Sequence, residues 1–152
     1  AYARAKLTTN GCTRAQVRHG DIYALSLADR HADAIVMHQI LHFLSDPSLA
    51  IREAARVLAP GGKLLIVDFA PHELEFLRTG EAHERLGFSH DQISGWLTDA
   101  GLVPKSVRDL TRKPGGSEDI LTVTLWLAER PNDPFAQSTR NAAITGTLEE
   151  AR

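Results

Sequence analysis

The sequence predicts an α/β fold built around a parallel sheet. Residues 34–37 and 64–67 are short, uniformly apolar runs, which is typical of strands covered on both faces. Between them, Asp46 and Pro47 mark the start of a helix, because Asp is a favoured N-cap and Pro fits the first helical position. Strand, helix and strand in this order indicate a right-handed βαβ unit.

Turn signals delimit the neighbouring elements. The Pro-Gly-Gly sequence at 60–62 ends the helix that follows Asp46, and an Asn-Gly stop predicts that residues 1–7 are the end of another helix. Residues 14–19, which follow this first helix, are a candidate for an extended segment.

The second half of the chain adds one helix and two strands. Ser89 and Gln92 have the spacing of a capping box and predict a helix that ends at Gly101. Residues 102–110 are a strand candidate. Residues 120–128 alternate between apolar and polar side chains, which predicts a half-exposed antiparallel strand at the edge of the sheet.

Polar segments connect these elements. Residues 71–88 predict a partly exposed helical insertion, and residues 111–119 contain a Pro-Gly-Gly loop. We therefore expect one domain over residues 1–128 and a poorly ordered tail over 129–152.

Composition excludes several classes of protein. The chain has 152 residues, of which 43% are hydrophobic and 24% charged, values typical of a single globular domain. The formal charge of −2 gives no overall positive field for nucleic acid. Cys12 is alone, and no apolar run approaches the length that spans a bilayer. We expect a cytoplasmic protein without membrane partners.

His38 and His42 have the spacing of the two histidines in the zinc metalloprotease motif HExxH. Gln39 stands where that motif needs a glutamate as general base, and no third ligand is suitably spaced. A zinc hydrolase is thus a remote alternative, and packing of each histidine is the simpler interpretation. We predict no metal site.

Two aspartates close predicted strands. Asp21 is either a turn residue or a carboxylate that accepts a hydrogen bond from an amine. Asp68 lies where open α/β sheets bind ligands, although a solvated carboxylate is an equal alternative. Trp96 and Trp126 stand at positions that packing in the core or on the sheet explains, so we assign them no chemical role.

Three segments together resemble a known family. They are Gly-Asp-Ile at 20–22, Asp-Ala-Ile-Val-Met-His-Gln-Ile-Leu-His-Phe-Leu at 33–44, and Arg-Glu-Ala-Ala-Arg-Val-Leu-Ala-Pro-Gly-Gly-Lys-Leu at 52–64. They resemble class I S-adenosylmethionine-dependent methyltransferases, in the small-molecule branch related to ubiquinone and menaquinone biosynthesis. The resemblance covers residues 1–128. It implies a Rossmann-like sheet, S-adenosylmethionine as cofactor and a small-molecule methyl acceptor.

The resemblance also assigns roles by position. Asp21 would accept a hydrogen bond from the adenine amino group and Ile22 would flank the ring. His38 and Gln39 would line the methionine end of the cofactor.

For the methyl acceptor, the resemblance implies a pocket faced by His42, Phe69 and His72. Methyl transfer depends chiefly on holding donor and acceptor close together, and protonated acceptors also need a base. His42 or His72 is the predicted catalytic base.

The family's glycine-rich loop, an acidic residue followed by G-x-G-x-G, is absent from these 152 residues, as is the acidic strand end that binds the ribose. We therefore expect the C-terminal portion of a methyltransferase domain, with a partial sheet that lacks its first two strands and little affinity for S-adenosylmethionine alone. Residues 33–37 would form an open edge, which favours a homo-oligomer.

A finer resemblance suggests an alternative function. His-Gln-Ile-Leu-His-Phe-Leu at 38–44 and Val-Asp-Phe-Ala-Pro-His at 67–72 are similar to the methyltransferase half of ArsR-type transcriptional regulators. In that case the chain is a ligand-sensing domain, and DNA is bound only through an upstream winged helix.

Overall fold

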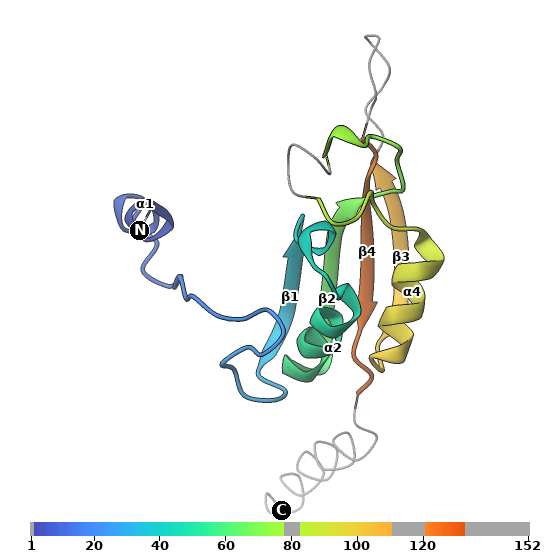
Figure 1. The fold of residues 1–152 in the computed structure, drawn as a ribbon. Helices are drawn as coiled ribbons and strands as arrows, with labels where there is room; N and C mark the ends of the chain where they lie inside the picture. The colour runs from blue at the N-terminus through green and yellow to red at the C-terminus, as the bar shows by residue number, and fades with distance from the viewer. Residues whose placement is uncertain (1, 78–82, 111–120, 133–152) are drawn as a thin grey trace, which may run out of the picture.

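The computed structural model describes residues 2–77, 83–110 and 121–132. The predicted loop at 111–119 and residues 133–152 of the predicted tail at 129–152 lie outside the described residues. The helices and strands follow in the order α1 (Tyr2–Thr9), β1 (Ala32–His38), the 3₁₀ turn η1 (Leu41–Phe43), α2 (Pro47–Val57), β2 (Leu58–Phe69), α4 (His90–Asp99), β3 (Val103–Leu110) and β4 (Val123–Glu129) (Figure 1).

The described strands form one mixed sheet in the order β1-β2-β4-β3. β1 and β2 are parallel and connected through α2, so the predicted βαβ unit is confirmed. β4 is antiparallel to both β2 and β3. The fold class is therefore the expected one, a partial Rossmann-like α/β sheet.

The position predicted for the last strand is wrong in one respect. β4 is antiparallel as expected, but it lies between β2 and β3, so that β3 forms the edge. Thr124, Trp126 and Ala128 are buried against the helices, whereas Leu125 and Leu127 on the opposite face are half-buried. The alternating sequence thus reflects one covered and one uncovered face of an internal strand.

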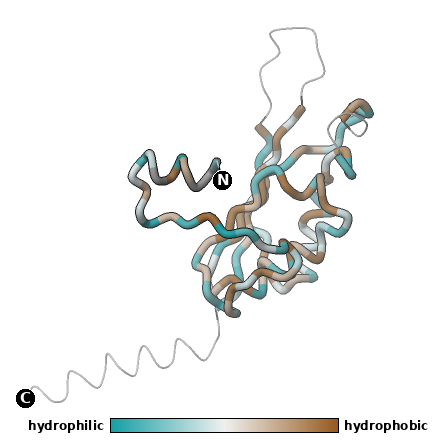
Figure 2. Tube along the Cα trace, turned by 60° about the vertical axis from the view of Figure 1, so that its left-hand side comes forward, coloured by the Kyte–Doolittle hydropathy of each residue, from teal (hydrophilic) through white to brown (hydrophobic). Residues whose placement is uncertain are grey.

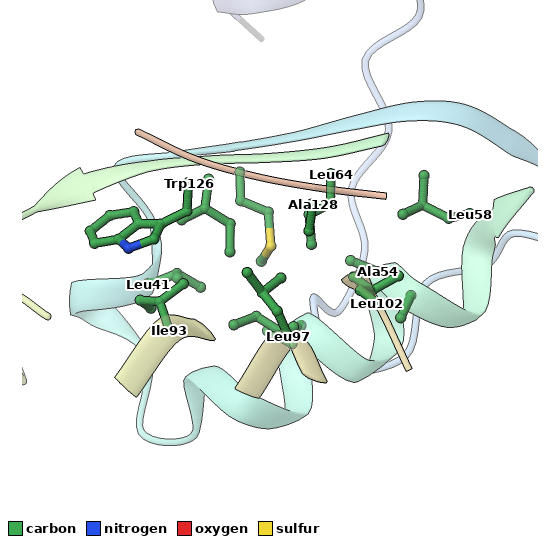
Figure 3. Packing of buried hydrophobic residues seen from close by; sticks show 14 of the residues in the cluster. Leu41, Ala54, Leu58, Leu64, Ile93, Leu97, Leu102, Trp126 and Ala128 are labelled. Atoms are coloured by element: carbon green, nitrogen blue, oxygen red, sulfur yellow. The ribbon is translucent and has the colours of Figure 1, made fainter. Parts of the chain in front are cut away.

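Helices α2 and α4 cover one face of the sheet and enclose the core (Figure 3). Both helices begin at the predicted caps: Asp46 Oδ1 accepts from the Leu49 amide at 3.1 Å, and Ser89 Oγ accepts from the Gln92 amide at 3.1 Å. Side chains from sheet and helices meet in this layer, among them Leu41, Ala54, Leu58, Leu64, Ile93, Leu97, Leu102, Trp126 and Ala128.

The opposite face of the sheet carries no helix from the described residues (Figure 1). Val36 on β1 is 61% exposed there, and the neighbouring Leu65 and Val67 are only half-buried. β1 also forms an edge of the described sheet, as expected. Pairing of this edge with a second copy of the chain stays a prediction.

The N-terminal segment lies apart from the sheet in both views (Figures 1 and 2). Helix α1 agrees with the predicted helix end, but residues 14–19 are exposed and pair with no described strand. No helix in the described part of the chain has the length and apolar character needed to cross a bilayer.

Residues 25–31 are held against α2 by a charged clamp. Arg56 donates to the carbonyls of Leu25 and Leu27 at 3.1 and 3.0 Å and also contacts the Asp29 carboxylate. Glu53 pairs with Arg56 at 2.7 Å and accepts from the Leu25 amide at 2.6 Å. The clamp fixes the segment that leads from Asp21 into β1.

The described segments of the loop after β2, residues 70–77 and 83–87, meet beside β2. The Phe88 amide donates to the Phe69 carbonyl at 2.9 Å, and the His72 amide donates to the Leu86 carbonyl at 3.1 Å. Residues 71–75 and 83–88 are irregular, so the prediction of a helix is wrong for them. These two hydrogen bonds hold the backbone in a non-helical path, although the residues of this segment favour a helix.

The neck of this loop requires a glycine. Gly87 has φ +82°, and a Cβ added there would lie 2.0 Å from the Ala70 carbonyl oxygen. We expect Gly87→Ala to lower the free energy of unfolding by at least about 2 kcal/mol, because strain and a backbone clash act together. Urea denaturation measures the change.

Gly95 provides the matched control. It lies in α4 with open space around its Cα, so Gly95→Ala should raise stability by about 0.5–1 kcal/mol. Equal effects of the two substitutions would contradict the assigned role of the neck.

Candidate functional site

The carboxyl ends of β1 and β2 lie side by side, since the two strands are parallel and His38 is in register with Val67. Ligands of open α/β sheets bind at such ends. The chain turns sharply there: Gln39 has φ +47°, and its amide donates to the Val67 carbonyl at 2.7 Å. A left-handed backbone is unfavourable for a residue other than glycine and is enriched at functional sites.

A buried imidazole–carboxylate pair lies at this end of the sheet. His42 Nδ1 is 2.7 Å from Asp68 Oδ1, and the two side chains are 2% and 0% exposed. Asp68 also accepts from the Leu41 amide at 3.0 Å and from the Phe69 amide at 2.9 Å. Asp68 is therefore not a solvated strand end, because it joins the turn after β1 to the end of β2.

Four further rings lie around this pair. The aromatic cluster, as we call it, consists of His42, Phe43, Phe69, His72 and His83. The His42 ring centroid is 4.1 Å from Phe43, 4.2 Å from His83 and 5.0 Å from Phe69. The Phe69 ring is 6.0 Å from His83 and 6.1 Å from His72. The cluster brings together the three residues that the sequence assigned to the acceptor pocket.

His83 was not predicted from the sequence. The loop after β2 brings it to the cluster, since the amides of Glu84 and Arg85 donate to the His42 carbonyl at 2.9 and 3.2 Å. Arg85 also donates to the Ser45 carbonyl at 2.9 Å. These contacts are long-range, and no local motif around His83 signals them.

His72 has two different nitrogens. Nδ1 accepts from the Leu74 amide at 3.3 Å. Nε2 is buried and has no hydrogen-bond partner in the described part of the chain. Burial lowers the pKa of His72, and the neighbouring His83 and His42 lower it further.

The zinc alternative fails on geometry. His38 is exposed at the end of β1, whereas His42 is buried in η1, so the two histidines do not share a helix face. Within the described ranges, no group of three or more side chains is arranged to hold a metal ion.

The residues assigned to the adenine lie in a separate turn. Asp21 is exposed, and its Oδ1 accepts from the Tyr23 amide at 2.9 Å. Ile22 is half-buried against the core. Tyr23 connects this turn to the start of α2, since its hydroxyl lies 3.3 Å from Ser45 Oγ and accepts from the Asp46 amide at 3.3 Å.

This arrangement fits only part of S-adenosylmethionine. An exposed carboxylate at Asp21 can accept from an amino group, and Ile22 offers an apolar contact. The glycine-rich loop that would cradle the rest is absent from the sequence.

Comparisons with known proteins agree with this fold. Residues 1–66 match the family model described as a methyltransferase domain. A probable S-adenosylmethionine-dependent methyltransferase of Mycolicibacterium smegmatis is 29% identical over 136 residues, which are 79% of this chain and 51% of that protein. The 27-O-demethylrifamycin SV methyltransferase of Amycolatopsis mediterranei is 31% identical over 107 residues, 65% of this chain and 39% of that protein.

Solved structures resemble the chain over a larger share. A putative methyltransferase from Bacillus halodurans superposes with a TM-score of 0.71 at 19% identity, covering 86% of this chain and 78% of that one. The chain spans about half the length of the M. smegmatis relative and less of the A. mediterranei one. The first 66 residues are thus similar to methyltransferase domains, the fold is similar to that of a putative methyltransferase, and the M. smegmatis relative is named as S-adenosylmethionine-dependent.

Removing the Asp68 carboxylate should destabilise the protein. Asp68→Ala leaves three buried donors, on His42, Leu41 and Phe69, without their acceptor. We expect a loss of about 2–4 kcal/mol in urea denaturation. Asp29→Ala, at an exposed partner of Arg56, is the control and should change stability by less than about 1 kcal/mol. Similar losses would show that burial of Asp68 is unimportant.

Acid should also destabilise the fold through His72. Its pKa is lowered from an ordinary value of 6.5, so the unfolded chain binds a proton more readily than the folded one. This contribution is complete above about pH 6.5 and is lost as the pH falls towards the folded pKa. The free energy of unfolding, measured at pH 7.5 and 5.5, should therefore fall less in His72→Gln than in the unsubstituted protein. An equal fall in both proteins would refute the role of His72.

Proposed function

We propose, from the premise of a class I S-adenosylmethionine-dependent methyltransferase domain, that this chain forms the acceptor side of an enzyme that methylates a small molecule. The observation that carries the proposal is the buried His42–Asp68 pair at the carboxyl ends of β1 and β2. An imidazole held by a carboxylate is a common arrangement for accepting a proton.

His42 is the proposed catalytic base. Asp68 accepts a hydrogen bond from His42 Nδ1–H, so Nε2 is the ring nitrogen that presents a lone pair to a reacting hydroxyl or amine. Phe43, Phe69 and His83 surround the ring and limit the access of water. When bound, S-adenosylmethionine would supply the methyl group.

Asp68 is the proposed positioning residue. It fixes the orientation of the His42 ring, and its contact with the Leu41 amide fixes the backbone that carries it. Positioning of the acceptor contributes to the rate independently of proton transfer, because methyl transfer requires close, aligned atoms.

The chain alone should bind S-adenosylmethionine weakly, since the backbone amides of a glycine-rich loop are missing. The experiment therefore uses the natural protein that contains this chain, with methyl-labelled S-adenosylmethionine and a panel of hydroxyl and amine compounds. Transfer of the label to a small molecule is the expected result.

The key variant is His42→Gln, which keeps a polar side chain of similar size but cannot accept the proton. We expect kcat to fall about 10²-fold to 10⁴-fold without a comparable change in the affinity for S-adenosylmethionine. His19→Gln, on the exposed N-terminal segment, is the matched control and should keep full activity. An unchanged rate in His42→Gln would overturn the role of His42.

The same panel separates catalysis from sensing. A ligand-sensing domain of an ArsR-type regulator would bind a compound at this site without transferring the label to it. Transfer supports the enzyme, and binding without transfer supports the sensor.

A further inference from the structure

We propose that the methyl acceptor is a flat hydroxy-carbonyl compound whose hydroxyl hydrogen-bonds to His42 Nε2 and whose second oxygen accepts a hydrogen bond from His72 Nε2. This inference rests on the proposed function, because it names the class of acceptor for the same site. It makes His72 a specificity residue instead of a second base.

The two histidines are held in opposite tautomers by their partners. A carboxylate only accepts hydrogen bonds, so the proton of His42 lies on Nδ1, facing Asp68 at 2.7 Å. A backbone amide only donates, so His72 Nδ1, which accepts from the Leu74 amide at 3.3 Å, carries no proton. The neutral His72 ring must then carry its proton on Nε2.

The state of His72 agrees with its surroundings. Burial is the main cause that lowers the pKa of His72, and this favours the neutral ring near pH 7. In that state His72 is an Nε2–H donor, and His42 is an Nε2 acceptor. The site thus offers one donor and one acceptor of hydrogen bonds.

The donor on His72 has no partner among the described residues. Its Nε2 is buried, and no acceptor among the described residues lies within hydrogen-bond distance. A buried donor without an acceptor destabilises the protein. An oxygen of a bound molecule would remove that cost.

The rings of the aromatic cluster favour a flat acceptor molecule. His42 and His72 both flank Phe69, with centroid distances of 5.0 and 6.1 Å. Phe43 and His83 add two further ring faces beside His42. Flat, conjugated compounds pack well against such rings.

The proton step is balanced within the site. The O–H bond of the acceptor breaks, the proton moves to His42 Nε2, and the oxygen keeps the electron pair as a nucleophile. The hydrogen bond from His72 to the second oxygen, a carbonyl on the same flat framework, makes that carbonyl more electron-withdrawing and so stabilises the negative charge that develops on the first oxygen.

The first test determines the tautomers in the 152-residue chain, without cofactor. Long-range ¹H–¹⁵N correlation spectra at pH 7.5 distinguish a protonated Nδ1 from a protonated Nε2. We expect protonated Nδ1 in His42 and protonated Nε2 in His72. Any other pair of states, including a doubly protonated His72, overturns the proposal.

The second test uses two matched probes, 3-hydroxyacetophenone and 3-ethylphenol. They share size and hydroxyl position, and only the first has the carbonyl oxygen that His72 would bind. NMR titration of the same chain should give at least about tenfold tighter binding of 3-hydroxyacetophenone, as expected for one satisfied buried donor. Equal binding, or binding of neither probe, overturns the proposal.

Two variants assign the preference to His72. His72→Phe keeps a ring but has no donor, and it should abolish the preference. His72→Gln presents an amide N–H at a similar distance from the backbone and should retain part of it. A preference that survives in His72→Phe overturns the assignment.

The outcome is separable from that of the proposed function. Absence of methyl transfer in the natural protein, together with a preference for 3-hydroxyacetophenone that depends on His72, would refute the enzyme but keep the binding site. Methyl transfer without this preference would keep the enzyme and refute the inference about its acceptor.

Discussion

The Asp68 carboxylate is the interaction on which the rest of the site depends. It is fully buried at the end of β2, and it joins two backbone amides and one imidazole through three hydrogen bonds. A buried carboxylate is tolerated only when its oxygens are satisfied in this way. The turn after β1, the His42 ring and the end of β2 are consequently fixed as one unit.

Two layers of contact extend outward from this unit. The aromatic cluster adds the rings of Phe69 on β2 and of His72 and His83 on the loop that follows, and this loop is closed at its neck by the Phe69–Phe88 hydrogen bond. On the other side, Tyr23 connects the turn at 21–24 to the start of α2. The candidate cofactor turn and the acceptor residues are therefore positioned by contacts to neighbouring backbone segments.

Much of the fold could be predicted because its signals are local. The cap at Asp46, the cap at Ser89 and the apolar strands each depend on a few adjacent residues, and the structure confirms them. The internal position of β4 could not be predicted, because period-2 alternation reports the faces of a strand and not its neighbours.

The site was predictable only in part for a related reason. His42 and His72 were identified through a family pattern, and the structure brings both to one cluster. His83 lacks such a pattern, because its place depends on hydrogen bonds from the following residues to the His42 carbonyl. The opposite tautomers of His42 and His72 depend on partners that become neighbours only after folding.

The neck at Gly87 limits which sequences can carry this cluster. The backbone at Ala70 and Gly87 approaches so closely that a side chain at position 87 would displace the residues that follow β2. Phe69 lies at the end of β2, and its carbonyl accepts from the Phe88 amide beside the same neck. Position 87 is thus constrained by geometry, although it contributes no atom to the cluster.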